Sequence, residues 1–293
     1  MCNLVIPART MGKNFLIAAV FLLATVAIPA FVYAQTDGMV SGDMASPIDP
    51  RFSYKPQFFG AVVGFGPSNQ TGEYVTDKCD CPAFTDGTGI RIILGGFYEH
   101  VIARNITLGA SILYNYHSLT ADYTENELVE YEKEGSSQKS KVKIPFLHTT
   151  NSSFTYITFQ PYFKYYLYKN LFTRVSPGFS FNVGSTLLHE KDMQITTTTL
   201  SDGETVNISF PPDKDARIVS NTKAIIQDTP FPKVTGFVLS ADLALGVEIK
   251  AGKRMSIAPV IQYSQPFMNA STSGTDFTLP SFLFSIEIKY GLD

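Results

Sequence analysis

The alternation of short and long connections between eight hydrophobic segments is the feature that most constrains how this chain can fold. Each segment has a two-residue hydrophobic period, which puts successive side chains on opposite faces of a strand. The segments lie at 56–66, 89–100, 106–117, 154–168, 171–187, 236–250, 255–268 and 280–290. The connections after the second, fourth and sixth segments are short, and the four others are long and polar. This arrangement predicts an all-β fold, an antiparallel up-and-down transmembrane β-barrel with short periplasmic turns and long outer loops.

The last segment shows the two-residue period most clearly. Phe282, Phe284 and Ile286 alternate with Ser and Glu residues over a length sufficient for a tilted membrane strand. Each short connection also carries a basic side chain, and these are Arg104, Lys169, Lys253 and Arg254. An even number of strands then places both ends of the barrel on the periplasmic side.

The longest connection, 188–235, leaves the number of strands open. Two β-like runs flank the turn-forming sequence Ser201-Asp202-Gly203-Glu204. They predict either a hairpin standing above the membrane or two further barrel strands. Eight strands is the main prediction and ten is the alternative.

The first 53 residues precede the barrel pattern. Residues 1–34 read as a secretory signal peptide, with Arg9 and Lys13 before an apolar run and a small-residue cleavage site at Ala34. Residues 35–53 are rich in Gly, Ser, Asp and Pro and are predicted to form a flexible periplasmic leader. The barrel domain is then expected over 54–293, in the bacterial outer membrane.

Composition narrows the class of protein. Charged residues are 17% of the chain and aromatic residues 13%, which excludes a disordered chain. A net charge of −3 excludes a typical nucleic-acid-binding protein. A soluble secreted barrel that binds an apolar ligand is the alternative to a membrane barrel. The scarcity of charge on the second strand face favours the membrane barrel, with outer-membrane lipid as its partner.

The segments ITFQPYFKYYLYKNLFTRVSPGFSF and LGVEIKAGKRMSIAPVIQYSQPF resemble a known group of proteins. Their aromatic alternation, basic turns and glycines are similar to the porin-like, PorT-like outer-membrane β-barrel proteins of Bacteroidetes-type bacteria. The resemblance extends over about 54–293. It implies an eight-stranded outer-membrane barrel, and it implies other envelope or secretion proteins as partners because some members serve in secretion machinery.

The polar faces of the segments provide nine charged side chains for the interior of the barrel. An eight-stranded barrel is just filled by its own side chains, so charges inside it must be paired. Two interpretations stay open: a lumen plugged by ion pairs, or a narrow solute path lined by charge. The nine predicted lumen residues are Arg91, Glu99, Lys164, Arg174, Asp242, Glu248, Lys250, Glu287 and Lys289.

Two further groups of residues carry chemistry. Cys79 and Cys81 lie in the first outer loop and form the predicted disulfide, although the spacing is geometrically tight. The adjacent pair His117 and Ser118 is the basis of an alternative function, an outer-membrane lipid-modifying enzyme. We assign no catalytic, cofactor-binding or metal-binding residue from the sequence. The main hypothesis is a non-enzymatic outer-membrane barrel with a structural, surface-interaction or small porin-like role, of open oligomeric state.

Overall fold

The computed structural model describes residues 57–77, 82–103, 105–132, 139–199, 205–207, 210, 216–252 and 254–292. The predicted signal peptide, the predicted leader, and both Cys79 and Cys81 lie outside these described residues.

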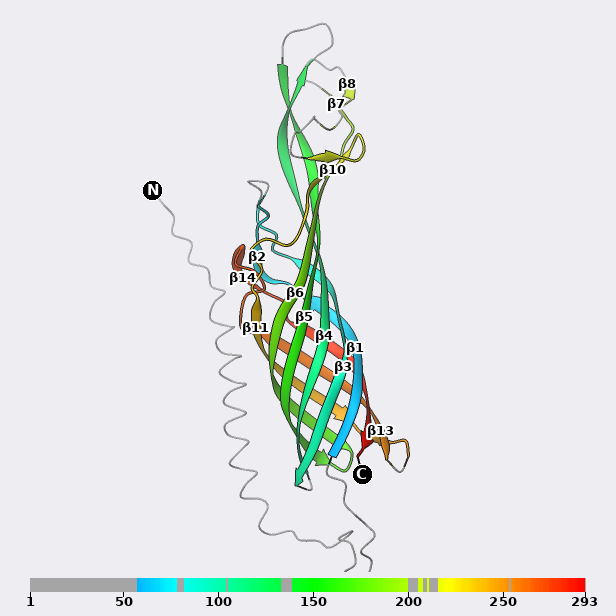
Figure 1. Ribbon diagram of the computed structural model, residues 1–293. Helices are drawn as coiled ribbons and strands as arrows, with labels where there is room; N and C mark the ends of the chain where they lie inside the picture. The colour runs from blue at the N-terminus through cyan, green and yellow to red at the C-terminus, as the bar shows by residue number, and fades with distance from the viewer. Residues whose placement is uncertain are drawn as a thin grey trace, which may run out of the picture. The chain divides into compact units, whose positions relative to one another are not determined.

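Eight antiparallel strands close into a ring (Figure 1). The ring is closed because β11 pairs with both β6 and β13, while β1 pairs with both β3 and β15. The prediction of eight barrel strands is therefore confirmed, and the alternative of ten is wrong. In chain order the ring strands are β1 (Gln57–Asn69), β3 (Gly87–Ala103), β4 (Ile106–Glu132), β5 (Lys139–Tyr168), β6 (Leu171–Met193), β11 (Phe237–Val247), β13 (Met255–Pro266) and β15 (Ser281–Gly291).

Burial alternates along the ring strands where they form the barrel wall, with the polar face inside. In β15, Ile286 is 51% exposed whereas the next residue, Glu287, is 3% exposed. Phe59, Phe65 and Ile112 are also exposed on the outer face of the ring. A soluble barrel would turn its apolar face inward, so this distribution belongs to a transmembrane barrel whose exterior meets lipid. Barrels of this type lie in the bacterial outer membrane, and this chain is located there.

The short turns predicted at the periplasmic end are present. Strands β5 and β6 are joined by Lys169 and Asn170, and Lys169 adopts a positive φ of 42°. The chain reverses between β3 and β4 within two residues, and the short strand β12 (Ile249–Lys250) leads into the turn before β13. Such tight reversals fix the register of each strand pair.

Three ring strands continue beyond the barrel at the opposite, outer end (Figure 1). The segment 118–153 was expected to be a long solvated loop, and that expectation is wrong for most of its length. Strands β4 and β5 stay paired from Ser118 opposite Ser153 to Glu132 opposite Lys139. Thr, Tyr and Val residues favour a β conformation, and they are frequent enough here to outweigh the many charges.

The remaining short strands belong to the outer connections. Strands β7 (Thr197–Thr199) and β8 (Thr205–Asn207) pair only with each other among the described residues, as a hairpin outside the ring. Strand β10 (Lys223–Thr229) pairs with the outer part of β6 and with β9 (Arg217–Ile218). None of the described residues forms a helix long and apolar enough to cross a membrane.

Aromatic side chains from the outer connections cover the mouth of the barrel. Strand β2 (Thr71–Tyr74) pairs with β14 (Gly274–Thr278), which brings the loops after β1 and β13 together. Tyr74 and Phe277 have ring centroids 4.9 Å apart, and Phe231 and Phe154 pack with them. These residues, with Phe84, are fully or almost fully buried. We call Tyr74, Phe84, Phe154, Phe231 and Phe277 the mouth cluster.

Candidate functional site

The structure places eight of the nine predicted lumen charges inside the barrel. Seven are buried, and Glu248 is half-buried. Lys250 is exposed, so the prediction is wrong for this residue. It lies in β12, opposite Ser256, at the periplasmic rim where the enclosing ring ends. The buried seven are Arg91, Glu99, Lys164, Arg174, Asp242, Glu287 and Lys289.

Glu99 is the centre of the first group of lumen charges. Its carboxylate lies 2.7 Å from Lys164 Nζ and 3.1 Å from Lys289 Nζ. The hydroxyl of Tyr162 donates a third hydrogen bond at 3.2 Å. Gly109 makes room for this ring, because a Cβ atom at that position would overlap it. Two cations and a hydroxyl therefore compensate the one buried carboxylate.

Glu248 extends this group toward the periplasmic rim. Its carboxylate lies 2.6 Å from Lys289 Nζ and 4.0 Å from Lys164 Nζ, and it accepts a hydrogen bond from Tyr166 at 2.5 Å. Two carboxylates and two ammonium groups thus form a neutral set. We call Glu99, Lys164, Glu248 and Lys289 the lumen cluster.

The other lumen charges are bonded further along the barrel. Arg174 forms an ion pair with Glu287 and donates to Gln262 at 3.1 Å. The Gln262 amide in turn donates to Asp242 at 3.1 Å. Arg91 donates to Asn115 and to Ser281, at 2.9 Å in each case. Polar side chains from across the ring therefore partner the charges in three hydrogen-bonded groups, around Glu99, Arg174 and Arg91.

Two small cavities lie between the side chains of the lumen. A cavity of about 30 Å³ is lined by Arg91, Asn115, His117 and Tyr156 among others. Another of about 10 Å³ lies beside Arg174 and residues of the opposite wall. Cavities of this size hold a few water molecules at most.

His117 and Ser118 do not form a pair. They are consecutive in β4, so their side chains point to opposite faces of the barrel wall. His117 is buried in the lumen, where its Nδ1 lies 3.3 Å from Ser68 Oγ. Ser118 Oγ donates to the carbonyl of Ile90 at 3.3 Å. The geometry required for the lipid-modifying alternative is therefore not present at these two residues.

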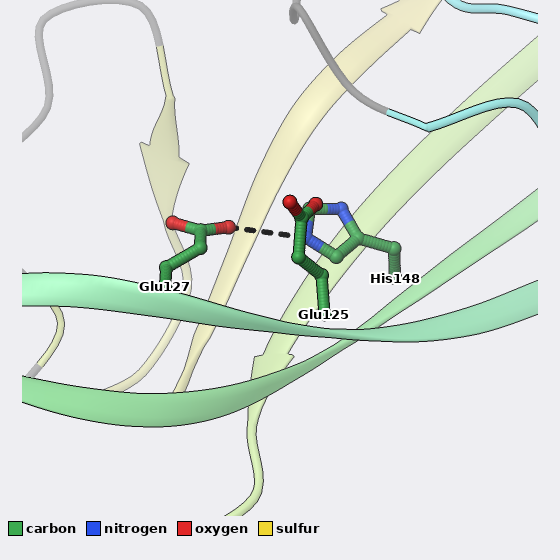
Figure 2. A group of neighbouring side chains, drawn as sticks. All are labelled: Glu125, Glu127 and His148. Carbon is green, nitrogen blue, oxygen red and sulfur yellow. Dashed lines mark hydrogen bonds and ion pairs between the residues drawn. The ribbon is translucent and has the colours of Figure 1, made fainter. Parts of the chain in front are cut away.

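A second polar cluster lies outside the ring, on the outer extension of β4, β5 and β6 (Figure 2). His148 Nε2 is 3.3 Å from the Glu127 carboxylate, and its Nδ1 is 3.1 Å from His189 Nε2. Lys191 Nζ lies 2.5 Å from Glu127, and Glu125 stands beside the imidazole. We call Glu125, Glu127, His148, His189 and Lys191 the outer cluster.

Apolar side chains enclose the outer cluster on two sides. Along the inward face of β5, His148 lies between Phe146, in one apolar cluster, and Phe154, in the mouth cluster. The ring of Tyr123 stacks on His148 with centroids 4.8 Å apart. His148 is 1% exposed as a result, whereas the Glu127 side chain is 33% exposed. Solvent therefore reaches the outer cluster at its carboxylates and, to a smaller extent, at Lys191, whose side chain is 14% exposed.

These surroundings change the protonation of several groups. The hydrogen bond from His148, followed by that from Lys191, lowers the pKa of Glu127, so this carboxylate is charged at neutral pH. Burial, with His148 and Lys191 nearby, lowers the pKa of His189 to about 4, which keeps that imidazole neutral. In the mouth cluster, burial raises the pKa of Tyr74 to about 12.

Sequence reasoning missed the outer cluster. Glu125 and Glu127 are two residues apart, which puts them on one face of a strand, but the segment was expected to be a loop. Treating 118–153 as a paired hairpin with its turn near 135 would have placed His148 opposite Tyr123. The signal in the sequence was thus the presence of two β-like halves of 118–153 at equal distances on either side of a polar centre near 135.

No protein-family model matches the sequence, and no curated protein matches it. Solved outer-membrane proteins are similar in structure. The attachment invasion locus protein Ail of Yersinia pestis is 7% identical, with coverage of 80% of this chain and 99% of that chain and a TM-score of 0.30. Neisserial surface protein A is 7% identical, with coverages of 81% and 97% and a TM-score of 0.27. The outer-membrane protease OmpT of Escherichia coli is 8% identical, with coverages of 83% and 99% and a TM-score of 0.26.

Proposed function

We infer that this protein is a non-enzymatic outer-membrane barrel with a closed lumen, which acts through the surface that its outer extension presents. The observation that carries this inference is the pairing of charges inside the ring. Glu99, Glu248 and Glu287 each bond to a lysine or an arginine, and Asp242 accepts from Gln262. A solute path needs polar groups that are free to exchange partners with water or ions.

The mouth of the barrel supports the same inference. Phe231 and Phe277 stack with centroids 5.7 Å apart above the polar lumen. An ion that entered from outside would have to cross this buried aromatic layer and then displace an ion pair. Both steps carry a large desolvation penalty. A small porin-like role is therefore the weaker candidate.

The outer extension is the part of the chain suited to interaction. Strands β4, β5 and β6 carry polar and half-buried side chains well beyond the lipid-facing belt. A barrel that anchors such a β-structured projection serves either a structural or a surface-binding role. The resemblance to the PorT-like group favours other envelope or secretion proteins as partners, with lipid around the barrel.

Single-channel recording in planar bilayers tests the closed lumen. We expect refolded wild-type protein to give no steady conductance, with folding verified by the heat-shifted gel mobility of the same preparation. A triple variant Glu99→Ser, Lys164→Ser, Lys289→Ser removes the centre of the lumen cluster and serves as the comparison. Regular, voltage-stable openings from folded wild-type protein would overturn the proposal in favour of a pore.

A further inference from the structure

We propose that Glu125, Glu127 and His148 bind a divalent transition-metal ion of the zinc class on the outer extension of the barrel (Figure 2). Each residue offers one ligand atom, and these atoms all lie within 4.8 Å of one another. One imidazole nitrogen and two carboxylate oxygens form a donor set that zinc accepts, with a fourth position left for water. The site is separate from the closed lumen on which the proposed function rests.

Strand pairing directs the three side chains to one point. Glu125 and Glu127 alternate onto the inward face of β4, and His148 lies on the same face of β5 because it pairs with Tyr123. Two ligand atoms on one zinc ion are about 3.4 Å apart, given bonds of about 2.1 Å in a tetrahedron. The ligand atoms therefore need to approach one another by at most about 1.4 Å, which rotation about the Glu side-chain torsions supplies.

His189 is placed to orient the ligand imidazole. In the structure, His148 Nε2 faces the Glu127 carboxylate at 3.3 Å, and His148 Nδ1 lies 3.1 Å from His189 Nε2, within hydrogen-bond distance. In the metal-bound form, His148 carries its proton on Nδ1 and donates to His189 Nε2, and its Nε2 lone pair faces the ion. His189 then carries its proton on Nδ1, toward Thr76 Oγ1 at 3.4 Å. The bond to His189 would then fix the orientation of the ligand ring, which is the role that a hydrogen-bonded partner plays for a metal-binding histidine.

In the structure, the Lys191 ammonium group pairs with the Glu127 carboxylate that the proposed metal ion would bind. This ammonium group lies 2.5 Å from Glu127 and 4.3 Å from the centroid of the Phe146 ring. The aromatic face gives this ammonium an alternative position once a metal takes the carboxylate. Glu125 has no hydrogen bond or ion pair with any other side chain that the structure describes. The cluster thus holds one carboxylate more than its lysine neutralises.

The donor set selects among metal ions. Calcium requires six to eight oxygen ligands, and magnesium retains most of its water, so neither gains from a buried imidazole. A histidine nitrogen with two carboxylates favours zinc and its neighbours in the first transition row. We therefore expect zinc or cobalt to bind and calcium not to compete.

Zinc titration of the whole mature chain tests the proposal. The protein is refolded in detergent without a polyhistidine tag, in a Cys79→Ser, Cys81→Ser background that removes both loop thiols as ligands. Competition with a chromophoric chelator should show one zinc ion per chain. Glu125→Gln should weaken zinc binding at least tenfold, because it removes a carboxylate ligand. The substitution should leave the fold intact, because Glu125 makes no hydrogen bond or ion pair with another described side chain.

Two further variants separate metal binding from a structural effect. Glu190→Gln is the matched control: it makes the same charge change on the opposite face of β6, where Glu190 pairs with Lys223 at 2.9 Å, and it should leave zinc affinity unchanged. Lys191→Met removes the competing ammonium and should strengthen zinc binding several-fold, a gain that damage to the fold would not produce. Cobalt added to the same protein should give the visible absorption of a four-coordinate site.

Three results would each overturn the assignment. These are the absence of a one-to-one zinc complex in heat-modifiable, folded protein, equal zinc affinity in Glu125→Gln and Glu190→Gln, and displacement of zinc by calcium at similar concentration.

Discussion

The lumen cluster and the outer cluster are built from the same chemical parts but differ in how completely those parts are matched. In the lumen, Glu99 is 0% exposed and contacts two lysines, which also contact Glu248. In the outer cluster, Glu127 is one-third exposed and contacts one lysine and one imidazole, and a second carboxylate, Glu125, lies beside them without an ion pair to another described side chain. The first set is neutral and enclosed, whereas the second has surplus negative charge and access to solvent. The comparison indicates that charge balance, more than residue type, separates a structural network from a binding site.

The enclosure of the two clusters has different causes. The closed ring fixes the backbone of Glu99, Lys164 and Lys289 in the lumen cluster, because each of their strands is paired on both sides. The outer cluster lies where only three of the ring strands continue, and loops supply the rest of its surroundings. Side chains in the outer cluster can therefore rearrange at lower energetic cost than those in the lumen.

The largest effect is expected from breaking the lumen cluster at its centre. Glu99→Gln keeps the size of the side chain but leaves the buried ammonium groups of Lys164 and Lys289 with less compensation. Loss of one partner of a buried ion pair costs about 3–5 kcal/mol. Urea unfolding in lipid vesicles should show a lowered free energy of unfolding of that order. Lys250→Gln, at the exposed rim, is the control and should change it little; equal stability of Glu99→Gln and wild type would contradict the comparison.

An intermediate effect is expected at the mouth cluster, and it depends on pH. Tyr74 donates to or accepts from Thr150 at 2.5 Å, and burial raises its pKa to about 12 from 10. A pKa that is higher in the folded state gives stability that is present below pH 10 and is lost as pH rises to 12. The loss amounts to about 2–3 kcal/mol for such a shift.

Tyr74→Phe isolates this contribution because it removes the ionisable hydroxyl and keeps the ring. At pH 7 the variant should be about 1 kcal/mol less stable, owing to the lost hydrogen bond. Between pH 10 and pH 12 the gap should close or reverse, because only wild type has the buried Tyr74 phenol to ionise. Unfolding measured across that range checks the prediction, and a gap that stays constant would show that Tyr74 does not stay buried in the cluster.

Much of the barrel could be predicted from the sequence, and the reason is geometric. Strict alternation in a segment such as 281–291 assigns both the lipid face and the lumen face at once, so Glu287 and Lys289 were predicted together. The prediction that Lys250 lies in the lumen was wrong because hydrophobic alternation does not indicate where the enclosing ring of strands ends. The turns were predictable because two-residue connections such as Lys169-Asn170 leave little freedom.

The outer parts depend on contacts that alternation does not encode. Phe84 and Phe231 lie in turn-rich segments without periodicity. Phe84 reaches the mouth cluster through an isolated bridge with Tyr74, and the segment of Phe231 is joined to the last outer loop by a bridge between Val234 and Ser271. His148 and His189 are 41 residues apart, and they meet because β5 and β6 extend above the ring. Charge density made the extension resemble a solvated loop. The same charges, once paired across strands, became the outer cluster.

The smallest change in the free energy of unfolding is expected from Glu127→Gln, the substitution in the outer cluster that corresponds to Glu99→Gln in the lumen. Glu127→Gln removes one carboxylate charge from a partly exposed pair with Lys191, and such pairs contribute about 0–1 kcal/mol to stability. The stability of Glu127→Gln should therefore lie within about 1 kcal/mol of wild type in the same urea assay, even though Glu127, like Glu99, contacts two nitrogen-bearing side chains. Solvent on one side of Glu127 can replace the lost contacts, whereas nothing in the lumen can. A loss as large as that of Glu99→Gln would mean that the outer cluster is as structurally essential as the lumen cluster, and it would remove the distinction between them.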